Sequence, residues 1–425
     1  MKILWTVFVT FPEVADKIGK KPEYACTWAR ALSESLRTQP EIELAIASIY
    51  DGKCLQKHVV NNVSFYFLPN GKAIKKNGGG IAARKYWNEI IKDYTPDIIH
   101  IHGSESNVPL ELVRSNPNIP IFLTLQGIIS NYYKDEYAGL GIGDLIYNIS
   151  LRDIVRCSGI ILDRHKTKIR SRYEQEILGK VRYFGGRTTW DKVSSLVWNQ
   201  TAKYLYSPEM IREQFYKADR WNIENIKRHR IFMHQGFKPI KGLHILLDAM
   251  YHLKKKYPDV ELYMSGTNYM KNCTFKDKLL QPGYVKLLFK KIREYDLEHN
   301  IHFTGVLDAD QIIEFLKSSH VMVLPSSIEN SPNSLVEAKL VGVPIVASYV
   351  GGVPDMLTHN EDGFLYTFNE PLLLAEFIGR VFDNDSLAEK FSINSYNNIR
   401  SIYSPHKVLL DTIQNYKNII ADWNK

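Results

Sequence analysis

From residue 230 onward, short apolar runs alternate with stretches of helical periodicity, and this alternation restricts the possible folds more than any other feature of the chain. The runs "RIFMHQG", "VELYMSG", "IHFTG" and "HVMVLPS" have the length and apolar character of buried strands. Between them lie "GLHILLDAMYHLKKKY", "VKLLFKKIREYDL" and "ADQIIEFLKSS", which are typical of helices. Strands that alternate with helices in this way predict parallel crossover units.

The first half of the chain follows the same alternation up to about residue 125. We expect strands near residues 3–9, 44–48, 65–68, 98–102 and 121–125, with helical patterns between them. From residue 144 to about 216 the chain is rich in Arg, Tyr and Trp, and we expect a helical region there. Because 425 residues are too many for one ordinary core, two doubly wound α/β domains are the natural expectation. We assign residues 1–220 to the first and 221–405 to the second, with a helix over 406–425 that packs back on the first.

The stretch "SSIENSPNSLVEAKLVGVPIVAS" predicts one complete crossover unit and an anion site within it. A helix is expected to start with Ser331 at the N-cap and Pro332 at the first helical position, and to stop at Gly342. The free backbone amides of the first helical turn and the positive end of the helix dipole would then face the preceding loop. Such a helix start suits a phosphate group.

Two carboxylates bracket this predicted anion site. Glu329 falls in the loop after the strand, whereas Glu337 falls one turn into the helix. Carboxylates are poor ligands for phosphate but good acceptors for sugar hydroxyls, so the combination points to a nucleoside diphosphate sugar. The alternative is chance spacing, because Ser334 and Glu337 also fit an ordinary capping box.

Charge and cysteine content narrow the classes of partner. The net charge of +8 lies entirely in residues 1–220, which hold 31 Lys or Arg against 23 Asp or Glu, and it is densest over 164–187. No signature of a nucleic-acid-binding module accompanies this charge, so we expect no nucleic acid and interpret it as a solvated face, an acidic-acceptor site or a peripheral contact with the anionic inner membrane leaflet. The four cysteines form no C-x-x-C pair, which predicts a reduced cytoplasmic protein without a metal cage. The N-terminus is expected to be a first buried strand rather than a signal peptide.

With these elements assigned, the second half resembles the nucleotide-sugar domain of the family 4 glycosyltransferases, which are retaining enzymes of the GT-B fold. The resemblance covers about residues 228–370. It rests on Lys241-Gly242 at a helix start, on "HFTG", on "VLPSSIENSPNSLVEAKLVGVPIVAS", on "GGVPDML" and on "DGFLY", in that order. The first half matches more loosely, through "DIIHIHGSE" and a glycine-containing loop after the first strand.

The resemblance implies a role for each matching position. Glu337 would bind the ribose hydroxyls and Glu329 the donor sugar, and Lys241 would pair with the diphosphate and stabilise the leaving group. Gly19 would let the first domain's loop approach the phosphate. The remaining positions would bind through their backbone: Ser331, Pro332, Asn333, Ser334 and Leu335 would hold sugar and diphosphate, Gly305 and Val306 would meet the base, and Gly266 would lie close by.

The chain departs from the family pattern at three places. Gln235-Gly236 stands where an arginine is usual, with Lys238 as a substitute; Gly19 is single rather than paired; and Gln126-Gly127 replaces a histidine after the fifth strand. We retain Gln126 as a substrate-binding candidate. His102, which alternates with His100 on one strand face, is a catalytic candidate, and a structural strand-end histidine is the alternative.

Three further motifs have a functional and an ordinary interpretation. Asp308-Ala309-Asp310 mimics a metal-binding D-x-D, but it precedes a helix and is better explained by capping. "NGGG" over 77–80 is expected to be a flexible loop, although it could cradle phosphate. "GGRTTWD" over 185–191 is a candidate for an acceptor site, and a plain loop is the alternative.

The sequence therefore predicts a cytoplasmic, metal-independent and cofactor-free retaining glycosyltransferase, and a peripheral position on the inner membrane face is left open. It would move a sugar from a nucleoside diphosphate donor to a saccharide or lipid-linked saccharide acceptor in polysaccharide or glycolipid synthesis. Two alternatives stay open, a nucleotide-sugar epimerase on the same scaffold and a non-catalytic two-domain sugar-binding protein.

Overall fold

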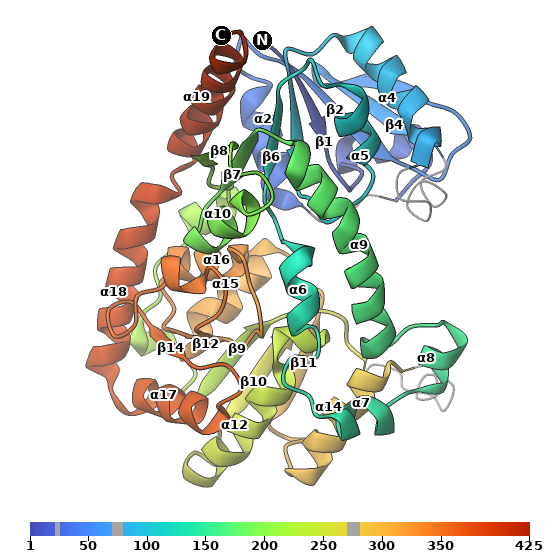
Figure 1. The fold of residues 1–425 in the computed structure, drawn as a ribbon. Coiled ribbons are helices and arrows are strands. Elements are labelled where there is room, and N and C mark those ends of the chain that lie inside the picture. The colour runs from blue at the N-terminus through green and yellow to red at the C-terminus, as the bar shows by residue number, and fades with distance from the viewer. Residues whose placement is uncertain (22–25, 70–79, 270–280) are drawn as a thin grey trace. The chain divides into compact units, whose positions relative to one another are not determined.

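Two α/β sheets organise the chain, as the alternation of strands and helices predicts (Figure 1). The computed structural model describes residues 1–21, 26–69, 80–269 and 281–425, so residues 77–79 of the "NGGG" motif lie outside the described part. The expected fold class of two doubly wound domains is confirmed.

The first sheet has eight strands in the order β3-β4-β2-β1-β5-β6-β7-β8, and only β3 runs antiparallel to its neighbour. The order reverses between β1 and β5, because successive strands are added on opposite sides of this pair. The strands span Lys2–Thr6 (β1), Glu43–Ile49 (β2), Gln56–Val60 (β3), Val63–Leu68 (β4), Ile98–His102 (β5), Ile121–Thr124 (β6), Tyr183–Gly186 (β7) and Lys203–Tyr206 (β8).

The second sheet has six parallel strands in the order β11-β10-β9-β12-β13-β14. Its order reverses between β9 and β12. The strands span Arg230–His234 (β9), Glu261–Ser265 (β10), Ile301–Gly305 (β11), Val321–Leu324 (β12), Ile345–Ser348 (β13) and Phe364–Tyr366 (β14).

Helices connect the strands of both sheets. Most of them bury an apolar face, as α12 does with Leu243, Leu246, Leu247 and Met250. The α-helices span Pro12–Ala15 (α1), Thr27–Leu36 (α2), Gly80–Tyr94 (α4), Leu110–Ser115 (α5), Ile129–Asp135 (α6), Ile142–Tyr147 (α7), Leu151–Val155 (α8), Ile160–Lys180 (α9), Thr189–Leu196 (α10), Glu213–Lys217 (α11), Leu243–Lys256 (α12), Gly283–Glu294 (α14), Ala309–Ser318 (α15), Asn333–Val341 (α16), Pro371–Asp383 (α17), Asp385–Ile402 (α18) and Pro405–Trp423 (α19), and the short 3₁₀ helices span Asp16–Ile18 (η1), Ile223–Asn225 (η2), Pro239–Lys241 (η3) and Val353–Asp355 (η4).

The chain forms two compact units. One contains Met1–Asn131, Thr167–Arg212 and Ile402–Lys425, and the other contains Tyr132–Lys166 and Glu213–Ser401. Residues 132–166, which we assigned to the first domain from sequence, therefore cluster with the second sheet. This segment is an excursion of the chain between β6 and β7, and its sequence carries no linker signal that would mark the change of unit.

The C-terminal helix α19 lies against the first sheet (Figure 1). The Tyr416 hydroxyl accepts a hydrogen bond from Trp5 Nε1 at 3.0 Å and lies 2.6 Å from His100 Nδ1. Trp5, His100 and Tyr416 are all buried, so this polar contact joins the first strand, the fifth strand and the last helix in one core.

The expected helical region over 144–216 is only partly correct. It contains α7 to α11, but the strands β7 and β8 interrupt it. Each of these strands has only four residues, "YFGG" and "KYLY". Four residues are too few for an alternation of apolar and polar side chains to identify a strand. They pair in parallel with β6 and with each other, so their strand structure comes from the edge that the sheet offers.

Candidate functional site

The predicted donor-site residues of the second unit lie where the strand order of its sheet reverses. Lys241 ends η3 in the connection after β9, and Glu329 lies in the loop after β12. Since β9 and β12 are parallel neighbours, the connections at their carboxyl ends meet at one edge of the sheet. In doubly wound folds this is the place where ligands bind.

Lys241 and Glu329 contact each other directly. The Lys241 Nζ atom lies 2.6 Å from Glu329 Oε1, and the Ser326 hydroxyl donates to the same oxygen at 2.7 Å. The Glu329 side chain is 9% exposed and that of Lys241 is 27% exposed, so the cation is the more accessible partner. The pair places one fixed positive and one fixed negative charge at the opening of the loop.

Close backbone packing holds these two side chains in position. Gly242 has φ +71, and a Cβ at this position would lie 1.8 Å from the Pro325 carbonyl oxygen, which only glycine avoids. The Ser327 amide donates to the Ile240 carbonyl at 2.8 Å, and the Gly352 amide donates to the Glu329 carbonyl at 3.0 Å. The loops after β9, β12 and β13 are therefore tied together by backbone contacts.

Helix α16 starts one residue later than expected. Pro332 occupies the N-cap with φ −68 and ψ 122, and the first helical residue is Asn333, so Ser331 is not the N-cap. An extended ψ at proline delays the first helical turn by this amount. Ser334 lies inside the helix and does not act as the N-cap of a capping box.

The amides expected to face the loop are not all available. The Leu335 amide donates to the Pro332 carbonyl at 3.0 Å, which closes the first turn. Ser331 and Glu337 are buried, at 6% and 7% exposure, in the loop and in the second turn of the helix. The carboxylates thus lie on either side of the helix start, as the sequence predicts.

Gly266 and Gly305 lie side by side at the ends of β10 and β11. The Gly266 amide donates to the Gly305 carbonyl at 2.8 Å, and both residues have positive φ, of +114 and +84. A Cβ on Gly305 would meet nothing within 4 Å, and the neighbouring Val306 side chain is 85% exposed. This edge of the sheet is therefore open and bordered by backbone, which suits contact with a flat ring.

The first unit contains a second cavity at its own strand-order reversal. The cavity has a volume of about 590 Å³, and residues after β1, β5 and β6 line it together with part of α2 and α9. It brings together two of the predicted residues, His102 and Gln126. Gly19, the third predicted residue of this unit, is the C-cap of η1 with φ +65 and is not among the lining residues.

His102 is buried and neutral at this cavity. Burial lowers the pKa of His102 to about 3. Its Nδ1 atom lies 3.3 Å from the Thr124 hydroxyl, while Nε2 has no hydrogen-bond partner within the described ranges. An unsatisfied buried nitrogen beside a cavity is a group that a ligand hydroxyl can satisfy.

Glu105 is a cavity residue to which the sequence analysis gave no role, although it ends the quoted "DIIHIHGSE" motif. Its Oε1 atom accepts from the Gly127 amide at 2.6 Å, and desolvation raises the pKa of its carboxyl to about 7. Arg170, also missed, donates to the Glu105 carbonyl oxygen at 2.7 Å. The sequence signal for Glu105 was its place at a strand end, whereas Arg170 lies in a long helix whose sequence gives no such signal.

The structure confirms the capping interpretation of Asp308-Ala309-Asp310, whereas "GGRTTWD" is not a plain loop, because it runs from the end of β7 into α10. Asp308 caps α15 in a capping box with Gln311, and no group of three or more potential metal-ligating side chains occurs among the described residues. In "GGRTTWD", Thr188 caps α10 and Asp191 accepts from the Tyr204 hydroxyl at 2.5 Å. Arg187 forms a buried ion pair with Glu209 at 3.4 Å, so this motif has a structural role.

Comparison with known proteins assigns the fold to the GT-B class. Sucrose-phosphate synthase from Thermosynechococcus elongatus superposes with a TM-score of 0.72 at 15% identity, over 99% of both chains. The Anabaena protein Alr3699/HepE, solved in complex with UDP-glucose, superposes with a TM-score of 0.67 at 16% identity, over 98% of this chain and 100% of that one.

Residues 217–398 match the family described as glycosyl transferases group 1. This part of the chain therefore matches the group 1 glycosyltransferase family, as the sequence motifs predict. The matched range contains Lys241, Glu329 and Glu337 but not His102, so the site at the second sheet lies within the family domain.

Two curated relatives align with very different shares of this chain. The 2-deoxystreptamine N-acetyl-D-glucosaminyltransferase of Niallia circulans is 29% identical over 132 residues, which is 31% of this chain and 33% of that protein. YtcC of Bacillus subtilis, which carries a provisional glycosyltransferase name, is 24% identical over 90% of this chain and 85% of its own length. The first match thus spans about a third of the relative's length.

Proposed function

We propose that the protein is a retaining glycosyltransferase that moves a hexosyl group from a UDP-sugar to an acceptor hydroxyl. The observation that carries the proposal is the Lys241–Glu329 pair at the strand-order reversal of a group 1 glycosyltransferase domain. The UDP-glucose bound to the Anabaena protein of the same fold supports the choice of donor class.

In the proposed reaction, the bond between the anomeric carbon and the β-phosphate oxygen breaks, and a bond from that carbon to the acceptor oxygen forms on the same face. The acceptor proton leaves to the departing diphosphate. Lys241 supplies positive charge where the leaving group develops negative charge. Glu329 accepts from the donor sugar hydroxyls, Glu337 accepts from the ribose, and the backbone at Gly305 meets the base.

We assign Lys241 two successive roles, one before the donor binds and one after. Before the donor binds, Lys241 neutralises Glu329 at 2.6 Å and so limits the cost of burying that carboxylate. When a diphosphate arrives, the same ammonium group is shared with it, and Glu329 becomes available to the sugar. The Lys241–Glu329 ion pair therefore prepares the site for an anionic donor.

We further propose that the acceptor is a saccharide and that the cavity with His102 and Glu105 receives it. Neutral imidazole and a carboxyl group with a pKa near 7 suit hydrogen bonding to sugar hydroxyls better than binding to a charged group. A lipid-linked saccharide in polysaccharide synthesis fits this acceptor class, and the protein would then work at the inner face of the cytoplasmic membrane.

Donor specificity can be tested by thermal denaturation of the purified chain with UDP-glucose, UDP-N-acetylglucosamine, GDP-mannose and free glucose. We expect a UDP-sugar to raise the melting temperature, because a ligand that binds only the folded state stabilises it. Incubation of the same donor with saccharide acceptors should release UDP. Conversion of the donor sugar without any acceptor would instead identify an epimerase, and stabilisation by free glucose alone would identify a sugar-binding protein.

A further inference from the structure

An exposed apolar surface covers the segment of residues 142–162, which we call the α7–α8 surface. Of the 22 large hydrophobic side chains that are prominently exposed in the described part of the chain, nine lie in this segment. In α7 these include Ile142 at 77% and Tyr147 at 89% exposure. Such a concentration in 21 residues marks an interaction surface rather than the usual scatter of exposed apolar residues.

Helix α8 has the reverse of the usual amphipathic arrangement. Its Asp153 is 4% exposed, whereas Leu151, Ile154 and Val155 are 56%, 64% and 75% exposed. A surface helix of an isolated water-soluble protein normally buries its apolar face. The described part of the chain therefore leaves the apolar side chains of this helix exposed.

The segment is firmly anchored, so this exposure does not come from loose packing. The buried Asp153 carboxylate accepts from the Gly283 amide at 2.8 Å and from the Ser150 amide at 3.1 Å. His244 Nε2 lies 2.8 Å from the Ala138 carbonyl oxygen, and its Nδ1 lies 3.0 Å from the Tyr284 hydroxyl. The Asp153 carboxylate therefore holds the segment to α14, and Ala138 holds the chain just before the segment to α12.

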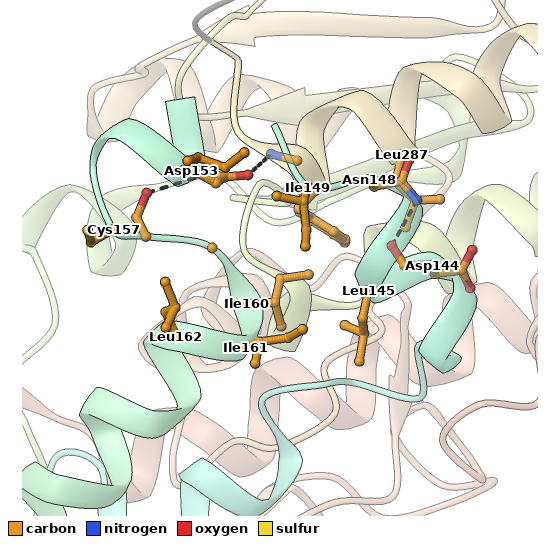
Figure 2. A pocket seen from close by; sticks show the side chains of 15 residues that line it. Asp144, Leu145, Asn148, Ile149, Asp153, Cys157, Ile160, Ile161, Leu162 and Leu287 are labelled. Carbon is orange, nitrogen blue, oxygen red and sulfur yellow. Dashed lines mark hydrogen bonds between the residues drawn. The ribbon is translucent and has the colours of Figure 1, made fainter. Parts of the chain in front are cut away.

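An apolar cavity of about 360 Å³ lies in the same segment (Figure 2). Leu145, Ile149, Ile160 and Ile161 surround it, and Leu287 of α14 lies at one side. The polar groups of Asp153 and Asn148 at its edge are engaged in hydrogen bonds. The cavity thus offers an apolar space with few polar partners, which suits a hydrocarbon chain.

The charged residues next to this surface favour an anionic binding partner. Residues 142–170 hold six Lys or Arg against three Asp, and one of these aspartates is the buried Asp153. Arg156, Lys166 and Lys168 are exposed beside the apolar residues. Apolar and aromatic side chains with flanking cations are the combination by which amphipathic segments lie in the interface of an anionic bilayer. No helix among the described residues is long and apolar enough to cross a membrane, so any membrane contact through these residues would lie at the bilayer surface.

We propose that the α7–α8 surface docks onto an anionic lipid bilayer, with its exposed isoleucine, leucine, valine and tyrosine side chains in the headgroup region. Docking would place the proposed glycosyltransferase at the membrane, and this role of the surface rests on the proposed function. Docking itself needs no sugar transfer. The proposed membrane contact lies on residues 142–162 and not on the basic run of residues 164–187 alone.

Vesicle co-sedimentation of the full chain tests the docking. We expect binding to vesicles of equal parts phosphatidylcholine and phosphatidylglycerol, and much weaker binding to phosphatidylcholine alone or at high salt. The triple variant Ile142→Asn, Tyr147→Ser and Val155→Asn should bind at least about tenfold more weakly. These side chains are largely exposed, so the variant should keep the melting temperature of the parent chain.

A matched control and a second variant make the test specific. Val193→Asn with Leu372→Asn also removes exposed apolar side chains, at 64% and 61% exposure, and should bind vesicles as the parent does. Arg156→Glu with Lys168→Glu should weaken binding to the anionic vesicles. Parent chain that stays in the supernatant, or a triple variant that sediments like the parent, would overturn the proposal.

Two further outcomes separate this proposal from its competitors. If the surface joins two copies of the chain, sedimentation velocity without vesicles would show a dimer that the triple variant converts to a monomer, and the parent would not bind vesicles. If the proposed function alone is wrong, vesicle binding would persist although no UDP-sugar shifts the melting temperature.

Discussion

Lys241 Nζ lies 2.6 Å from Glu329 Oε1, although the two residues are 88 positions apart in the chain. Each follows a strand of the same parallel pair, β9 and β12. The contact exists because the connections that follow two parallel neighbouring strands meet at one edge of the sheet, and the reversal of strand order there is where ligands bind in doubly wound folds.

Removal of the two bracketing carboxylates should reduce sugar transfer without unfolding the chain. Glu329→Gln keeps the size of the side chain and removes the charge, and Glu337→Ala removes the proposed ribose acceptor. We expect each to lower kcat/KM by about 10²-fold, which is the usual effect of losing a group that orients substrate. Release of UDP with a saccharide acceptor measures the effect, and the exposed Glu298→Gln is the control. Near-parental rates in both variants would contradict the assigned roles.

Lys241→Met should separate the roles of the two lysines near this loop. Because Lys241 contacts Glu329 and would face the diphosphate, its loss should lower kcat by about 10²-fold. Lys238 is exposed at the N-cap of η3, so Lys238→Met should lower kcat by less than about tenfold. Steady-state kinetics with the same donor decide the comparison. A larger loss at Lys238 would mean that it replaces the arginine that the family usually has near this position.

Gly242→Ala should destabilise the second unit by about 3 kcal/mol, because strain at positive φ adds to a clash with the Pro325 carbonyl oxygen. Gly305→Ala provides the matched comparison, since Gly305 also has positive φ but open space around the added methyl group. We expect a loss of about 1 kcal/mol there. Urea denaturation followed by tryptophan fluorescence measures both, and equal losses would show that the close approach to Pro325 has no energetic effect.

The buried His102 predicts a pH dependence of stability with a definite sign. Its pKa is about 3 in the folded chain, against about 6.5 when unfolded, because burial disfavours the charged form. Between these values the unfolded state binds the additional proton. The contribution of His102 to the free energy of unfolding is therefore fully present above about pH 6.5 and is lost as the pH falls toward 3.

We expect His102→Gln to remove about 2 kcal/mol of the stability change between roughly pH 7 and pH 5. Glu105 acts in the opposite direction because its folded pKa is raised to about 7, so the parent and the variant must be compared at each pH. Denaturant unfolding at several pH values provides the measurement, with the exposed His299→Gln as control. Parallel curves for parent and His102→Gln would show that His102 titrates normally.

Strong local sequence patterns were sufficient to predict many of the strands and helices. The strands β9 to β12 and the helices α12, α14 and α15 follow from periodicity, because each is long enough to bury one face or a continuous apolar run. The short strands β7 and β8 were missed because sheet pairing, not their own residues, stabilises them. The start of α16 was placed too early because Ser331 and Pro332 satisfy the local preferences for a helix start, whereas the loop keeps Pro332 extended.

The sequence by itself determined the alternation of strands and helices, the family motifs and the two glutamates that bracket a helix start. These are local properties, since periodicity, capping and glycine positions act over a few residues. Only the tertiary structure decided that Lys241 pairs with Glu329, that His102 and Glu105 share a cavity, and that residues 132–166 join the second unit with their apolar side chains exposed. Those relationships join residues far apart in the chain, and the strand order and long-range packing that create them leave no signal in any one segment.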